Sequence, residues 1–350
     1  MKFSNNYILY PDNKALEQAI VHYISMLADD IAEETKPDTK VTVPDNFTHT
    51  RGNFEQRRYN SNILESARKT LESKLTEELR KQEPLEWAAL QNSLGNILAA
   101  LGQHQRDEDL YNKAIAAFNN ALRELDQDNK PQDWASTHYN LGTATQALGR
   151  QLSDSKLLKK SIDAYTNALL EWTREKTPME WATAMFQLGL TFHTHGKLLK
   201  GNRTFQKSVV AFKNALTELD ADNTPYELAF THNNRGAVLH HLGESEENPG
   251  RLEEAIRSYE TGLLVCMEQQ LPIHLAVMCR VNRSTARNVL AELTKDSALA
   301  EEAADDFELI IECFTNALQP LCLKHCEEQL SKARAMVEAF SGGAREAGQT

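Results

Sequence analysis

Cysteine is scarce in this 350-residue sequence, and all five cysteines fall in the last quarter of the chain. An odd number of thiols crowded into one region does not suit a disulfide framework, so we expect reduced thiols in a cytoplasmic protein. The chain also lacks an apolar run near the ~18 residues that a membrane span requires. Its first residues contain no apolar segment followed by a small-residue cleavage site, which argues against secretion.

Positive charge is scarce as well. The chain has 38 Lys and Arg against 50 Asp and Glu, a formal net charge of −12. Non-specific nucleic-acid binding needs clustered bases that neutralise phosphates, so this balance disfavours DNA or RNA as a partner. The sequence contains no CxxC, no glycine-rich phosphate loop, no GxSxG and no HExxH motif. We therefore expect neither catalysis nor a cofactor.

What the sequence does contain is a period of 47 residues. Proline keeps this period in five copies, and glycine and aromatic positions keep it in four. The prolines are Pro84, Pro131, Pro178, Pro225 and Pro272; the glycines are Gly95, Gly142, Gly189 and Gly236; the aromatics are Phe118, Tyr165, Phe212 and Tyr259. A fixed period of this length indicates stacked units that share one continuous core.

Each unit has the pattern of two helices. A proline suits the first position of a helix, because its missing N–H would have no partner there. Capping boxes are expected at Thr177 with Glu180 and at Thr224 with Glu227. The second helices carry apolar residues at i, i+3, i+4 and i+7. Each first helix is expected to stop at a left-handed glycine. These glycines are Gly102, Gly149, Gly196 and Gly243.

The segments "YNLG" (139–142), "ALG" (147–149) and "SIDAYTNAL" (161–169), with the proline that follows, resemble the tetratricopeptide repeat (TPR). That motif has Leu-Gly in its first helix and small, aromatic and small residues in its second. Its usual length is about 34 residues, so this chain is similar to a long-period variant. The resemblance covers residues 84–318 and implies an all-α fold: a right-handed α-solenoid of stacked helix pairs, a TPR-like superhelix.

We divide the chain accordingly. The repeat array covers residues 61–318, with a half-repeat at 61–83 and repeats that start near 84, 131, 178, 225 and 272. Residues 1–60 are expected to hold a helix and an irregular loop, residues 319–340 a capping helix, and residues 341–350 a disordered tail. Within the array we expect the glycines to let paired helices approach closely. The aromatics fill the space between pairs, and the tryptophans pack on the preceding repeat.

The resemblance also implies a concave surface, lined by the first helices, that binds a peptide or helix of another protein. Carried over by motif position, its residues are Asn92, Asn96, Tyr139, Asn140, Thr143, Gln146, Phe186, Gln187, Leu190, His193, Asn233, Asn234, His240, Arg280, Ser284 and Arg287. We expect the amides to read a peptide backbone, because an amide donates and accepts hydrogen bonds. Tyr139 and Phe186 would be apolar anchors. Clamps for a C-terminal carboxylate need lysines at these positions, and their absence excludes that partner class.

Residues 150–213 carry eleven Lys and Arg against five acids, a local charge of +6 that leaves −18 for the rest. The bases that we expect near the loops between helices form what we call the basic strip: Lys156, Lys159, Lys160, Lys197, Lys200, Arg203 and Lys207. Such a strip predicts salt-sensitive docking of an acidic partner. A solvated edge without a partner is the alternative.

Two other hypotheses stay open beside the protein-binding scaffold. His193 and His240 are one period apart, and the first hypothesis is a groove that senses a small ligand or a metal. No carboxylate or cysteine shares the phase of these histidines, so we predict no metal site. Alternatively, residues 1–53 could occupy the groove of a second copy. Cys322 and Cys326, one helical turn apart, are expected to be packing thiols.

Overall fold

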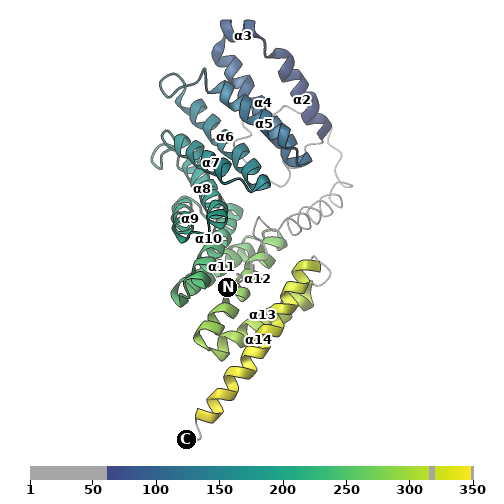
Figure 1. Ribbon diagram of the computed structural model, residues 1–350, viewed down its shortest axis with the longest axis vertical. Helices are drawn as coiled ribbons and strands as arrows, with labels where there is room; N and C mark the ends of the chain where they lie inside the picture. Colours follow the sequence, from purple (N-terminus) through teal and green to yellow (C-terminus); the bar gives the residue numbers. More distant parts are fainter. Residues whose placement is uncertain (1–60, 315–319, 348–350) are drawn as a thin grey trace. The chain divides into compact units, whose positions relative to one another are not determined.

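The computed structural model describes residues 61–314 and 320–347, and in these residues the chain is helical without any β-strand (Figure 1). The helices are α2 (Ser61–Lys74), α3 (Glu77–Gln82), α4 (Pro84–Gln105), α5 (Glu108–Ala121), α6 (Pro131–Leu152), α7 (Ser155–Ala168), α8 (Pro178–Leu199), α9 (Asn202–Ala215), α10 (Pro225–Ser245), α11 (Pro249–Glu268), α12 (Ile273–Thr294), α13 (Ser297–Phe314) and α14 (Pro320–Ala347). The helix and loop expected in residues 1–60 lie outside the described residues.

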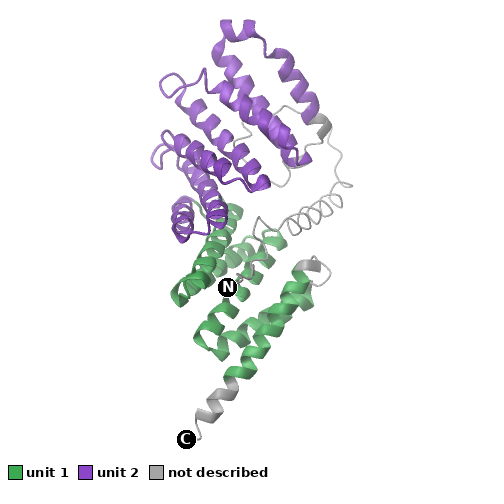
Figure 2. Cartoon of the chain, viewed as in Figure 1, with its two compact units in different colours: residues 1–39, 219–350 green, residues 40–218 purple. Residues whose placement is uncertain are grey.

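The chain forms two compact units, and in chain order we call the purple one in Figure 2 the first unit and the green one the second unit. The described part of the first unit holds α2 to α9, and the second unit, from Leu219 onward, holds α10 to α14. In the first unit α4 pairs with α5, α6 with α7 and α8 with α9, and successive pairs meet through α5–α6 and α7–α8. In the second unit α10 pairs with α11 and α12 with α13, and α14 packs on α12 and α13. Each unit is therefore helical and repeat-like.

The helix starts follow the prolines, whereas the helix ends do not follow the glycines. Proline occupies the first position of α4, α6, α8 and α10, as predicted. The predicted glycine stops are wrong, because no glycine in the described residues has a positive φ. The left-handed residue is Arg106 after α4, Ser153 after α6 and Lys200 after α8. Each first helix thus runs about one turn past its glycine, and this turn takes up part of the surplus length of the repeat.

Side-chain caps are found on the second helices instead of the first. Thr177 and Thr224 precede α8 and α10, but neither side chain makes a capping hydrogen bond, so the predicted capping boxes are not formed. By contrast, the carboxylates of Asp107 and Asp154 accept from first-turn N–H groups of α5 and α7. The equivalent residue before α9 is Gly201, which leaves that helix without a side-chain cap.

At each in-phase glycine an aromatic ring of the paired helix lies so close that a Cβ would not fit. A Cβ added at Gly189 would lie 2.6 Å from the nearest ring carbon of Phe212. The same approach occurs between Gly95 and Phe118, Gly142 and Tyr165, and Gly236 and Tyr259, at 2.5–2.8 Å. Ser208 strengthens this contact, since its hydroxyl donates to the backbone oxygen of Gly189 over 2.6 Å. The expected close approach of paired helices is therefore confirmed.

Large aromatic side chains also join one pair to the next, as predicted. Tyr165 of α7 shares a buried cluster with Ala184 and Leu188 of α8. Trp134, at the start of α6, packs against the cluster formed by Ala88, Ala121 and Leu125 of the preceding pair. Buried apolar side chains therefore join neighbouring helix pairs of the first unit.

In the fifth copy of the repeat, both partners of the glycine–aromatic contact are replaced. Arg283 stands where glycine is found in the other copies, and Asp306 stands where the aromatic is found. The two side chains form an ion pair, with a guanidinium nitrogen of Arg283 2.6 Å from Asp306 Oδ2. Both are only 14% exposed. The helix pair α12–α13 is therefore joined by a charged contact at the point where the other pairs use an apolar one.

The last helix, α14, closes the second unit. Its Cys322 and Cys326 are buried in one cluster with Phe307 of α13 and Val281 of α12, as expected for packing thiols. The helix continues to Ala347, beyond the end expected for the capping helix.

Candidate functional site

Half of the residues expected to line a concave surface are buried. The buried members are Tyr139, Asn140, Gln146, His193, Asn233, Asn234, His240 and Ser284. The partly exposed members are Asn92, Asn96, Thr143, Phe186, Gln187, Leu190, Arg280 and Arg287. A side chain with almost no exposed surface cannot contact a partner unless the unit rearranges, so only the second group is available for contact in this structure.

Several of the amides are engaged inside their own unit. Asn140 Nδ2 donates to Asn92 Oδ1 over 3.1 Å, and Gln146 Nε2 donates to Thr191 Oγ1 over 2.8 Å. Both bonds join consecutive first helices, α4 to α6 and α6 to α8. In the second unit Asn282 Nδ2 donates to Asn233 Oδ1 over 3.0 Å. These buried bonds hold neighbouring first helices in register, a role that amides facing a groove would not have.

Arg287 is also committed to a contact within its unit. Its guanidinium lies 2.9 Å from both Asp306 Oδ2 and Glu260 Oε1, and Ser284 Oγ donates to the same Asp306 oxygen over 2.8 Å. With Arg283, these side chains form a network that ties α12 to α11 and α13. The carboxylates therefore offset the charge of Arg287.

The two in-phase histidines belong to different units, His193 to α8 and His240 to α10. Burial lowers the pKa of His240 to about 3, with smaller contributions from the nearby charges of His241 and Lys332. This imidazole is therefore neutral at pH 7. In the residues that the structure describes, no group of three or more His, Cys, Asp or Glu side chains is gathered in a way that could hold a metal ion.

Six of the seven strip residues lie on helices, which corrects the expected position on loops, and only Lys200 follows the end of a helix. Lys156, Lys159 and Lys160 belong to α7, Lys197 is in the last turn of α8, Lys200 caps α8, and Arg203 and Lys207 belong to α9. All seven lie in the first unit, and all but the partly buried Lys197 are exposed.

The exposed bases of the strip have no acidic partner within the described part of the chain. Salt bridges there involve other side chains, and none includes Lys156, Lys159, Lys160, Lys200, Arg203 or Lys207. One member makes a different contact: Lys207 Nζ lies 5.6 Å from the ring centre of Phe192. The six exposed bases of the strip are thus positive charges without an ion pair in the described residues, on a chain that is acidic overall.

Two residues beside the strip were not identified as site residues from the sequence. Ser155 Oγ, in the first turn of α7, lies 2.9 Å from Nε2 of His195 on α8. The pKa of His195 is lowered by partial burial and by the charges of Lys159 and Lys207. These two lysines belong to the helices that pack on α8: Lys159 to α7 and Lys207 to α9. Ser155 and His195 are 40 residues apart in the sequence. Their contact could be predicted only from the packing of α7 on α8.

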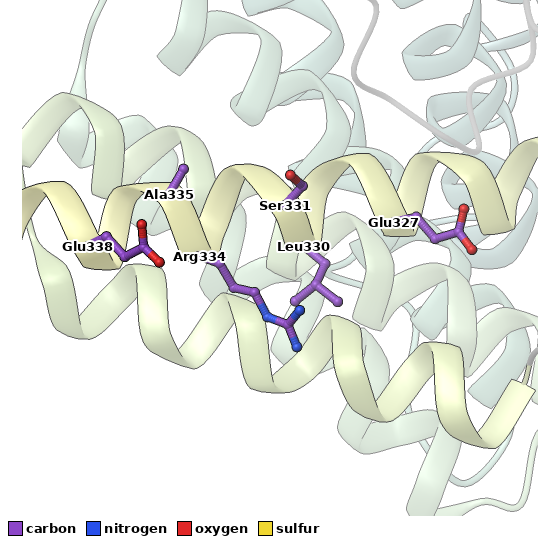
Figure 3. A pocket seen from close by; sticks show the side chains of 6 residues that line it. All are labelled: Glu327, Leu330, Ser331, Arg334, Ala335 and Glu338. Carbon is purple, nitrogen blue, oxygen red and sulfur yellow. The ribbon is translucent and has the colours of Figure 1, made fainter.

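The second unit has a shallow pocket along one face of α14 (Figure 3). It is lined by Glu327, Leu330, Ser331, Arg334, Ala335 and Glu338. Arg334 binds Glu308 of α13 over 2.7 Å, and Leu330 packs on the adjoining core. All the lining residues come from one helix, so the pocket lacks the groups converging from several elements that typical ligand sites have.

Comparison with known proteins gives the fold alone. No family model matches the sequence, and no curated protein matches it. Among solved structures, the chain is similar to BtubC (BKLC) from P. vanneervenii, with a TM-score of 0.50 and 18% identity over 73% of this chain and 92% of that one. In the described residues no helix is both long and apolar enough to cross a membrane. The likeness to BtubC supports a helical repeat-like fold.

Proposed function

We propose that the chain is a non-catalytic protein-interaction scaffold whose helix pairs form a TPR-like α-solenoid within each unit, and that it binds an acidic segment of a partner protein through the basic strip. The 47-residue period and the glycine–aromatic contacts support the architecture. The composition and the absence of catalytic motifs from the sequence support a binding role. The strip supplies the chemistry that a partner would recognise.

One observation carries this proposal. Asp109 of α5, Lys156 of α7 and Arg203 of α9 occupy the same position of the repeat, in the first turn of the second helix. The partial positive charge of a helix N-terminus favours an acid there by about 0.3–1 kcal/mol, and it opposes a base. Only α5 follows the preference for an acid. Folding does not require the bases of α7 and α9, so we assign them to contact with a negatively charged partner.

The partly exposed first-helix residues can extend such an interface. Phe186 offers an apolar ring, and Gln187 and Asn96 offer amides at the surface of the same unit. These residues would add apolar contacts and hydrogen bonds to the partner, in addition to long-range charge attraction.

Affinity capture from a native lysate tests the proposal with three forms of the full chain. The strip variant carries Lys156→Glu, Lys160→Glu and Arg203→Glu. The matched control reverses three other exposed lysines of the first unit, namely Lys69, Lys113 and Lys213. We expect the wild type and the control to retain the same acidic proteins and the strip variant to lose them. Retention should also fall at about 1 M salt, where the screening length is about 3 Å. Equal recovery by all three forms would contradict the proposal.

A further inference from the structure

The basic strip has a focal point at His195. Ser155 and Lys159 lie one turn apart on α7 and therefore share a face of that helix. Lys207 approaches from α9, where its ammonium lies near the ring of Phe192, one turn before His195 on α8. The hydroxyl of Ser155 and the imidazole of His195 thus meet directly. Lys159 lies one turn from Ser155, and Lys207 contacts a ring one turn from His195.

The acid nearest in sequence forms no ion pair with this group in the described residues. Asp154 caps α7, and its Oδ1 accepts from the N–H groups of Lys156 and Leu157 at 2.7 and 3.2 Å. That carboxylate is occupied by the backbone of the helix. The charges that shift the pKa of His195 come from Lys159 and Lys207, both of which lower it.

The number and type of donors indicate the ligand. A carboxylate offers two oxygens and one negative charge, whereas a phosphate monoester offers three terminal oxygens and nearly two charges at pH 7. If Nε2–H of His195 donates to Ser155 Oγ, the serine hydroxyl is left to donate outward, together with the two ammonium groups. Three donors then match three phosphate oxygens. The hydrogen bonds of the two lysines to a phosphate would be charge-assisted, and such bonds are stronger than neutral ones.

We propose that Ser155, Lys159, His195 and Lys207 form a binding site for a phosphorylated serine or threonine in the acidic segment of a partner protein. This inference rests on the proposed function and specifies its partner. A phosphorylated protein segment fits better than a small free anion because the positive charge does not stop at these four residues. Lys160 continues along α7, Lys200 caps α8, and Arg203 lies in the first turn of α9, so that acidic residues on either side of the phosphate also find a base.

Fluorescence polarisation with the full chain tests the site. The probes are three labelled peptides of alternating Glu and Gly that differ only at the central residue, which is phosphoserine, serine or glutamate. We expect the phosphoserine peptide to bind at least about tenfold more tightly than the other two. Lys159→Gln and Lys207→Gln should each remove most of this preference, because they weaken binding of the phosphoserine peptide by a larger factor than binding of the serine peptide. Lys213→Gln, an exposed lysine elsewhere on α9, is the control and should change nothing.

Three results would overturn the inference. Binding of all three peptides within about twofold, with dependence on the strip, would show recognition of charge alone; the proposed scaffold function would survive this result. Failure of the phosphoserine peptide to bind at about 1 mM would remove the site altogether. Strip-dependent binding of phosphatidylserine vesicles, stronger than that of the phosphoserine peptide, would assign the surface to a lipid headgroup. Loss of acidic-protein capture in the strip variant is judged separately, so failure of the scaffold proposal is distinguishable.

Discussion

The glycine–aromatic contact makes Gly189→Ala a sharp test of how the pairs are packed. The substitution exchanges a poor helix former for the best one, which alone would stabilise α8 by about 1 kcal/mol. The added Cβ would meet three ring carbons of Phe212 at 2.6, 2.7 and 2.9 Å. That ring is fully buried and cannot swing into solvent. Overpacking of this kind costs about 1–3 kcal/mol, so we expect a net loss of about 1 kcal/mol.

Urea unfolding of the full chain, followed by circular dichroism, measures this loss as a change in the free energy of unfolding. Phe212→Leu should relieve the clash, so the double variant should be less destabilised than the two single changes together, with a coupling of at least about 1 kcal/mol. Gly250→Ala is the matched control, because the nearest atom to its added Cβ is Asn248 Oδ1 at 3.4 Å. We expect no loss there. A Gly189→Ala variant as stable as this control, without coupling to Phe212, would refute the packing described for the pairs.

Other predictions concern capping, the amides, the charged pair and pH. Gly201→Asp should stabilise the first unit by about 0.3 kcal/mol, since it supplies the side-chain cap that α5 and α7 have and glycine is only a few tenths of a kcal/mol worse than aspartate there; chemical denaturation measures this gain, and a loss of stability would contradict the assignment of Gly201 as the cap position. Asn140→Ala should cost about 1–3 kcal/mol through the unpaired Asn92, and an unchanged denaturation midpoint would show the bond to be dispensable. Asp306→Ala should cost about 3–5 kcal/mol, because two largely buried guanidiniums lose their carboxylate; a loss below about 1 kcal/mol would contradict this. His240 is neutral in the folded state and becomes protonated more readily when unfolded, so its contribution is complete above pH 6.5 and is lost as the pH falls toward 3. At pH 5 the free energy of unfolding of the second unit should be about 2 kcal/mol lower than at pH 7 because of this residue. His240→Phe should weaken that acid sensitivity.

The period carried most of the information about the fold. Proline, glycine and aromatic positions predicted paired helices and their starts, because these residues act through local backbone geometry and close packing. The helix ends were missed for a physical reason. Gly102, Gly149 and Gly196 are needed where the second helix packs closely, so their presence does not mark a left-handed turn. In a sequence, glycine can indicate either a left-handed helix end or a close contact between helices.

The candidate site was less predictable. Motif position placed Asn140 and Gln146 on a binding face, but a single sequence does not show whether an amide faces solvent or the neighbouring helix. Their hydrogen bonds to Asn92 and Thr191 appear only when two repeats are placed side by side. The positive strip was visible from composition, yet its focus at His195 depends on the packing of three helices.

The central claim, that α7, α8 and α9 present bases to an acidic protein partner, is tested most directly by lysine footprinting. The full chain is treated with an acetylating reagent, alone and with the partner retained in the capture experiment, and each lysine is quantified by mass spectrometry. We predict protection of Lys156, Lys159, Lys160 and Lys207, with unchanged modification of Lys69, Lys113 and Lys213. Unchanged modification of the strip lysines in the complex, or protection confined to the other three, would contradict it.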